Sequence, residues 1–281
     1  MLKEKKQNFI SQFLLSKLRH HSADNKPRKD LCDFGRICHE IIPGDVLLME
    51  GSSYVSQLIK RVTHSYWTHA SLYIGRLHSI QNLETRKMIL EYCVCDPSDQ
   101  LLLETWPGQG TVINPITKYQ DEHIRICRPT GISFEDTQRV ITYAVSHLGG
   151  DYNMRHFFDL GRYMLASKWL PARWGSSLFK KHKPTKTSKD ICSALIAEAF
   201  VSVNFPILPL ILEEQDGKTV MIHRNPKLFV PSDFDYSPYF NIIKYPIFPG
   251  QGNEPYHNYP WDLTRINNDR FIDRQELEAQ D

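Results

Sequence analysis

The sequence has few cysteines, almost no net charge and no long apolar run. Its 281 residues include 34 Lys or Arg and 32 Asp or Glu, which gives a formal net charge of +2. The overall charge therefore gives no reason to expect a nucleic-acid-binding protein. Six cysteines in a chain of this length do not form the dense disulfide framework of a small secreted domain. No apolar stretch is long enough to span a bilayer. With 41% hydrophobic and 23% charged residues, the composition is that of an ordinary globular protein.

Residues 1–35 are predicted to form an amphipathic extension followed by a polar linker. Six apolar residues between Phe9 and Leu18 recur at helical spacing, but polar residues interrupt them. Because there is neither a continuous apolar region nor a small-residue cleavage site, this segment does not have the pattern of a secretory signal. We therefore expect a cytoplasmic protein, with peripheral membrane association or export by a non-classical route as alternatives. The helix is expected to dock on the protein's own body, the alternative being a membrane surface.

The body of the chain, residues 36–249, is predicted to be a single α+β domain, with a polar tail at 250–281. Short apolar runs predict strands, and apolar residues with a period of 3.6 predict helices. The expected strands are 46–49, 69–75, 88–94, 101–105, 124–128 and 240–245, and the expected helices are 55–62, a helix between Ser133 and Gly149, and one that begins near residue 190. The strands follow one another too closely for crossover helices, so the sheet is expected to be mainly antiparallel.

Cys93 and Cys95 are two residues apart in an apolar stretch. This spacing places both side chains on the same face of a strand, and we interpret them as buried thiols. Cys38 and His39 could be combined with them into a zinc site, but the spacing matches no common ligand pattern. No metal or other cofactor is expected.

Cys192 lies at the start of an apolar helix. It falls in the first turn whether Ser188 or Asp190 is the N-cap. The helix macrodipole and the free backbone N–H groups there favour a thiolate, and the same N–H groups can hold a developing oxyanion. Asp190 would oppose the thiolate if its carboxylate points inward. The alternative interpretation is that Cys192 is one more apolar residue of a buried helix.

A histidine and a glutamate are the candidate partners of this cysteine. His69 begins a predicted strand and could project into a cleft, where an imidazole would activate the thiol. The alternative is a structural histidine, and His64 is a competitor for the role. Glu104 ends a very apolar run, where an unpaired carboxylate is costly to bury. An imidazole N–H would satisfy it as in a catalytic triad, and Arg125 is the alternative partner.

Short motifs accompany these three residues in a particular order. They are PGDVLL (43–48), WTHASLYIG (67–75), ETW (104–106), GTV (110–112), KY (118–119), GGDY (149–152) and ICS (191–193). Together they resemble the permuted NlpC-type papain-like amidases of the YaeF/YiiX type, over about Ile41 to Tyr245. The histidine and the acid precede the cysteine, which is the permuted order, because ordinary papain-like enzymes have the cysteine first.

The resemblance implies a circularly permuted papain-like (NlpC-type) fold, in which a mainly antiparallel sheet packs on the helix that carries the nucleophile. It implies Cys192 as nucleophile, His69 as general base and acid, and Glu104 as the residue that orients the histidine. The implied activity is a cysteine hydrolase that cleaves amide bonds in cell-wall peptides through a thioester. A lipid-directed thioesterase or acyltransferase and a catalytically inactive binding protein are the alternatives. The chain has Ile191 and Ala194 where many relatives carry an aromatic residue and an acid.

Residues 153–190 form a basic, aromatic-rich insertion. Nine Lys or Arg stand against two acids there, and six aromatic residues are interleaved with them. Part of the insertion is expected to pack on the body, and the rest could form a solvated loop or a lid beside the cysteine. Contact with an anionic membrane surface is the alternative, because basic and aromatic residues together suit lipid headgroups. Nucleic acid is not an expected partner, since no recognisable motif is present. The expected substrate is a peptide or acyl-amide.

Overall fold

A computed structural model describes residues 32–106, 109–150, 192–214 and 217–244. The chain divides into two units, Met1–Ile243 and Lys244–Asp281, and all the helices and strands given below belong to the first unit. The amphipathic N-terminal helix, the insertion at 153–190 and the tail from residue 250 lie outside the described residues. The predicted domain boundaries therefore stay predictions.

The centre of the first unit is a six-stranded sheet in which every neighbouring pair is antiparallel. The strand order is β4-β3-β2-β1-β5-β8. The strands are β1 (Val46–Met49), β2 (His69–Gly75), β3 (Leu101–Trp106), β4 (Gly110–Pro115), β5 (Ile124–Pro129) and β8 (Phe240–Ile243). A separate two-stranded sheet consists of β6 (Leu210–Glu213) and β7 (Thr219–Ile222). The prediction of an α+β protein with a mainly antiparallel sheet is confirmed.

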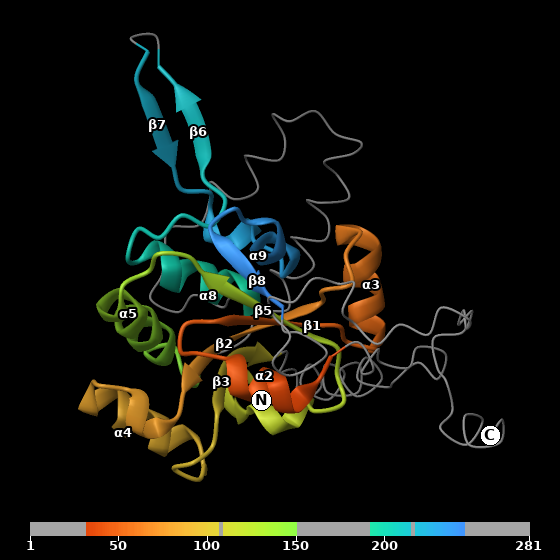
Figure 1. The fold of residues 1–281 in the computed structure, drawn as a ribbon, viewed down its shortest axis with the longest axis vertical. Helices are drawn as coiled ribbons and strands as arrows, with labels where there is room; N and C mark the ends of the chain where they lie inside the picture. Colours follow the sequence, from red (N-terminus) through yellow and green to blue (C-terminus); the bar gives the residue numbers. More distant parts are fainter. Residues whose placement is uncertain (1–31, 107–108, 151–191, 215–216, 245–281) are drawn as a thin grey trace, which may run out of the picture. The chain divides into compact units, whose positions relative to one another are not determined.

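Helices α5 and α8 pack together, and α8 also packs on β2 and β3, as Figure 1 shows. The helices are α2 (Phe34–Glu40), α3 (Tyr54–Thr63), α4 (Leu83–Tyr92), α5 (Phe134–Val145), α8 (Cys192–Val201) and α9 (Ser232–Tyr236). Short 3₁₀ turns lie at Leu77–Ser79, Ile116–Tyr119 and Pro226–Leu228. Alternate residues of β2, such as Leu72 and Ile74, point into the same core as Phe200 of α8. Burying each such side chain stabilises the fold by about 1.5–3 kcal/mol. The core therefore fixes α8 against the middle of the sheet.

Most predicted elements are confirmed, but the strand at 88–94 was predicted wrongly. Residues 88–92 belong to α4, because Asn82 accepts hydrogen bonds from the N–H groups of Glu84 and Thr85 and so caps a helix. A short apolar run does not distinguish a strand from a buried helix turn, and the cap decides for the helix here. Cys93 is consequently the C-cap of α4 rather than a strand residue, and both Cys93 and Cys95 are half-buried rather than buried.

Strand β4 was not predicted, since its proline and asparagine are uncommon in strands. It forms because β3 supplies a continuous partner, from Leu101 opposite Pro115 to Trp106 opposite Gly110. Of the helices that the structure describes, none combines the length and the apolar character needed to cross a bilayer.

Candidate active site

The site lies at the end of the sheet where β2 begins and the neighbouring β1 ends. His69 is the first residue of β2 and pairs with Met49. The pairing of Tyr73 with Leu102 places His69 and Glu104 on the same face of the sheet, because side chains alternate along each strand. The His69 ring packs against Trp106, with ring centroids 4.9 Å apart, and its side chain is 15% exposed.

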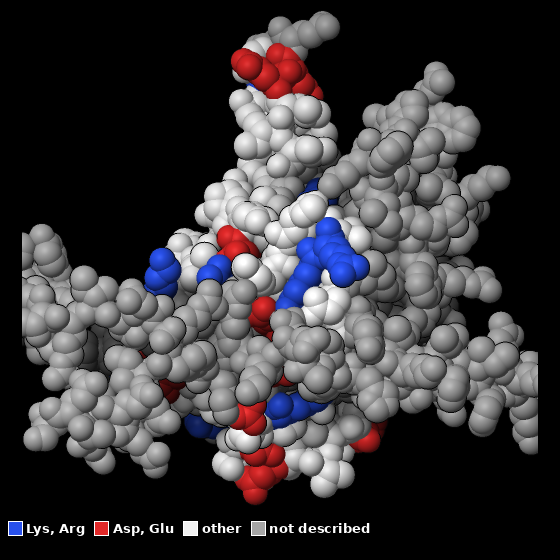
Figure 2. All heavy atoms as spheres, turned by 90° about the vertical axis from the view of Figure 1, so that its right-hand side faces the viewer, with Lys and Arg blue, Asp and Glu red and all other residues white. Residues whose placement is uncertain are grey.

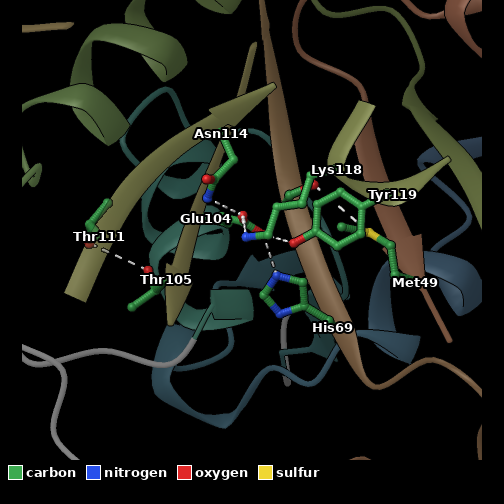
Figure 3. A network of polar contacts seen from close by, with 9 residues as sticks. Met49, His69, Glu104, Thr105, Thr111, Asn114, Lys118 and Tyr119 are labelled. Atoms are coloured by element: carbon green, nitrogen blue, oxygen red, sulfur yellow. Dashed lines mark hydrogen bonds and ion pairs between the residues drawn. The ribbon is translucent and has the colours of Figure 1, made fainter. Parts of the chain in front are cut away.

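Glu104 is buried, and four side chains bind its carboxylate (Figure 3). Its Oε2 accepts hydrogen bonds from His69 Nε2 at 2.6 Å and from the Tyr119 hydroxyl. Its Oε1 accepts from Asn114 Nδ2 at 2.6 Å and from Lys118 Nζ at 3.0 Å. Each oxygen of the carboxylate therefore accepts two hydrogen bonds, which matches its capacity as an acceptor.

The three partners of Glu104 other than His69 come from the strand that the sequence did not predict and from the turn after it. Asn114 lies in β4 directly opposite Leu102, diagonally across from Glu104 on the same face. Lys118 and Tyr119 lie in the 3₁₀ turn that follows β4, and the Lys118 ammonium group also lies 4.5 Å from the centroid of the Trp106 ring. The motif Lys118-Tyr119 was part of the family resemblance, but without β4 nothing placed it beside Glu104.

The bonds to Glu104 keep it ionised. Burial, the largest single effect, would raise the pKa of its carboxyl group, but the hydrogen bond and positive charge of His69, the charge of Lys118 and the Tyr119 hydrogen bond act in the opposite direction. Together they lower the pKa of Glu104 to about 2. The site thus holds a permanent negative charge next to the imidazole, which favours the protonated ring.

Cys192 is the first described residue of α8 and is 7% exposed. The charge of His69 and the backbone N–H groups of Ala70 and Ser193 act on its thiol and lower the thiol pKa. His69 Nε2 is bonded to Glu104, which leaves Nδ1 as the ring nitrogen available to the thiol. The hydroxyl of Ser193 donates to the carbonyl oxygen of Phe229 at 2.7 Å and anchors the start of the helix.

The protonation of Cys192 and His69 is coupled. Burial would raise the pKa of the Cys192 thiol, but the charge and hydrogen bond of His69 and the two backbone N–H groups lower it overall. Burial would lower the pKa of His69, whereas the Cys192 sulfur and the Glu104 carboxylate raise it overall. Both shifts favour a thiolate–imidazolium pair, which is the reactive form of a cysteine nucleophile.

The structure thus brings Cys192, His69 and Glu104 together, although they come from three separate elements. The structure does not favour the two competing residues. Arg125, the alternative partner of Glu104, donates to Asp235 at 2.7 Å instead. His64, the alternative to His69, is an exposed residue at the end of α3. Ala194 is buried beside Val230, so it does not line a solvent-accessible surface. Asp190 and Ile191 lie outside the described residues.

A second buried acid lies near the same edge of the sheet. Glu50 directly follows β1 and accepts hydrogen bonds from Lys60 Nζ at 2.9 Å and from His123 Nδ1 at 2.9 Å. The His123 ring packs on Trp67, with ring centroids 5.0 Å apart. This acid is bound, like Glu104, by a histidine and a lysine. Within the described ranges, no group of three or more His, Cys, Asp or Glu side chains is arranged to hold a metal ion.

Comparison with solved structures finds distant likenesses. The crystal structure of the metalloprotein YiiX from Escherichia coli O157:H7 is similar to this chain with a TM-score of 0.43 and 13% sequence identity. The alignment covers 72% of this chain and 96% of YiiX. No protein-family model matches the sequence, and no curated protein is similar to it. The permuted papain-like topology implied by the sequence resemblance stays a prediction.

Proposed function

We propose that this chain is a cysteine hydrolase on a circularly permuted papain-like fold, and that it cleaves an amide bond in cell-wall-type peptides. Cys192 is the nucleophile, His69 the general base and acid, and Glu104 the residue that orients and charges the histidine. The observation that carries this proposal is that His69 is hydrogen-bonded to a buried, ionised Glu104 and lowers the pKa of the Cys192 thiol. No further cofactor is needed for this chemistry.

In the proposed reaction, the Cys192 thiolate attacks the carbonyl carbon of the amide. The negative charge moves to the carbonyl oxygen, and the backbone N–H groups in the first turn of α8 are the proposed donors to it. Imidazolium Nδ1 of His69 then gives its proton to the leaving amine, the carbon–nitrogen bond breaks, and a thioester forms. A water molecule attacks the thioester after giving a proton to the same Nδ1, which releases the acid and regenerates the thiol.

The same residues would also support a lipid-directed thioesterase or acyltransferase, in which an acyl acceptor replaces water. The basic insertion at 153–190 is then the proposed contact with an anionic membrane surface. A binding protein that has lost its chemistry is the remaining alternative, and it would not need the thiol of Cys192. All three alternatives share the site, so the first experiment concerns the reactivity of the cysteine.

The test is partial alkylation with iodoacetamide over a pH series, followed by intact mass measurement and peptide mapping. We expect Cys192 to react in preference to the other five cysteines below about pH 8, and His69→Ala to abolish this preference. Buried Cys127, whose thiol pKa is raised chiefly by burial, is the internal control and should stay unmodified. Labelling spread over several cysteines would refute the assignment of Cys192 as the nucleophile. A reactive Cys192 justifies comparing wall peptides with acyl lipids as substrates, with Cys192→Ala as the blank.

A further inference from the structure

The histidine of the candidate site lies at the end of its strand pairing. His69 forms the last pair of the ladder between β1 and β2, opposite Met49. On the other side of β2, the pairing with β3 extends only to Leu72, opposite Leu103. The terminal pairs of a ladder open more readily than the central ones. The backbone that carries the His69 imidazole therefore needs a further anchor if the ring is to stay in place.

Thr68, the residue before His69, is held by two hydrogen bonds that can serve as this anchor. Its backbone N–H donates to the carbonyl oxygen of Met49 at 3.0 Å. Its side-chain Oγ1 accepts from the backbone N–H of Gly51 at 2.9 Å. We call these two bonds the Thr68 clamp. Thr68 is 4% exposed, and both bonds use backbone groups of Met49 and Gly51, so the side chain of Glu50 takes no part in them.

Gly51 leaves no room for a side chain at the clamp. A Cβ atom at this position would overlap Ser56 Oγ and would lie 2.9 Å from Thr68 Oγ1, closer than real Cβ atoms approach. The φ angle of Gly51 does not lie in the left-handed region, so space and not backbone conformation requires glycine here. The close approach that glycine permits allows the Gly51 N–H to reach the Thr68 hydroxyl.

The first turn of α3 packs against the clamp on the Gly51 side. Ser53 caps this helix, and its hydroxyl bonds to the Ser56 hydroxyl at 2.9 Å. Helix α3 lies on the side of the molecule that faces the viewer in Figure 2, where Lys and Arg side chains appear as a blue patch. The clamp itself contains no charged group, and both Thr68 and Ser56 are buried. It is therefore suited to holding the chain and not to binding a charged group of a substrate.

The segment that the clamp holds carries two groups of the candidate site. The His69 ring is bonded through Nε2 to Glu104 Oε2 at 2.6 Å. The next residue, Ala70, has a backbone N–H that acts on the Cys192 thiol. A displacement of Thr68 would therefore move both the imidazole and this N–H group relative to the cysteine.

We propose that Thr68 is a positioning residue, which acts through its hydroxyl to fix His69 relative to Cys192. The same bond fixes the amide of Ala70. This inference rests on the proposed function and adds a residue to its machinery. Without the hydroxyl, the Gly51 N–H would be buried without an acceptor, which is costly, so the turn at Gly51 and the segment that it holds would move. A misplacement of about 1 Å can cost about 100-fold in rate, and we expect a smaller displacement here.

The test compares threonine variants by the rate of iodoacetamide alkylation of Cys192 over a pH series. Thr68→Val keeps the shape of the side chain but removes the oxygen; we expect a rate about tenfold lower near pH 7 and a profile shifted to higher pH. Thr68→Ser keeps the oxygen and should react within about threefold of the wild type. Thr137→Val, in α5, removes another buried hydroxyl, which donates to the Ser133 carbonyl oxygen at 2.9 Å, and should leave the rate unchanged. Urea unfolding shows that each variant is folded.

The outcomes separate this inference from the proposed function. A folded Thr68→Val variant that reacts as fast as the wild type at every pH would overturn the inference alone. A Thr68→Ser variant as slow as Thr68→Val would also overturn it, because the hydroxyl would then not be the effective group, and so would an equal loss in Thr137→Val. If Thr68→Val does not fold, Gly51→Ala decides: it displaces the clamp from the other side and should slow Cys192, whereas a wild-type rate overturns the inference. A wild-type protein without preferential labelling of Cys192 would refute the proposed function itself, and this inference with it.

Discussion

Replacing Glu104 by Gln tests the electrostatic basis of the candidate site. Gln has nearly the same shape as Glu but no charge. In the variant, the His69 imidazolium therefore loses its buried counter-ion, the Glu104 carboxylate, whose Oε2 lies 2.6 Å from His69 Nε2 in the wild type. Two opposite charges whose centres are about 5 Å apart interact by about 3 kcal/mol at an effective dielectric constant of 20. Each 1.4 kcal/mol corresponds to a factor of ten, so the population of the thiolate–imidazolium pair should fall about 100-fold. Lys118 is 36% exposed and can turn toward water in the variant.

The assay is the second-order rate of iodoacetamide alkylation of Cys192 between pH 5 and about pH 9, the range that spans ordinary imidazole and thiol titration. We expect a reduction of about 100-fold near pH 7 and a shift of the rate profile to higher pH, as the counter-ion argument requires. Glu50→Gln is the matched control, because Glu50 is also a buried acid bound to a histidine and a lysine. It should leave the Cys192 rate unchanged. A folded Glu104→Gln variant that reacts within twofold of the wild type at every pH would refute the reasoning.

Three further predictions follow from the same contacts. Tyr119→Phe removes one of the four donors to Glu104, so we expect a loss of about 1–2 kcal/mol in the free energy of unfolding, measured in urea, and a Cys192 alkylation rate lowered by about threefold to tenfold. The pKa of Glu104 is about 2 in the folded protein, and its ordinary value is 4.5. Between these two pH values the unfolded state therefore binds more protons than the folded state. Glu104 therefore contributes about 3 kcal/mol of stability above pH 4.5, and this contribution is lost as the pH falls toward 2. The difference in urea midpoint between the wild type and Glu104→Gln should disappear over the same range. Phe200→Ala should cost about 3–5 kcal/mol in thermal or urea unfolding, because Phe200 is fully buried and packs edge-on against Phe240; a cost below 1 kcal/mol would contradict its place in the core.

Local sequence signals predicted the elements that carry their own caps or their own alternation. Ser133 accepts a hydrogen bond from Asp136 N and starts α5, and β2 begins at His69 and ends at Gly75, as the pattern indicates. The same signals failed where two elements compete. Asn82 is a helix cap, but the apolar residues that follow are too few to show a helical period, so the sequence predicts a strand at 88–94 where the second half of α4 lies. Strand β4 has no strand pattern of its own and depends on β3 for its formation.

The sequence by itself determined which side chains have chemistry and which of them require a partner. An acid that ends an apolar run must be paired if it is buried, and a cysteine in the first turn of a helix is in a position that favours the thiolate. The choice of partners depended on the tertiary structure. His69 and Glu104 are 35 residues apart, and they meet because the register of β2 and β3 places them on one face. Cys192 joins them because the core holds α8 against β2. Burial creates the need for a partner, which a sequence displays locally, but strand register and helix packing decide which partner is within reach.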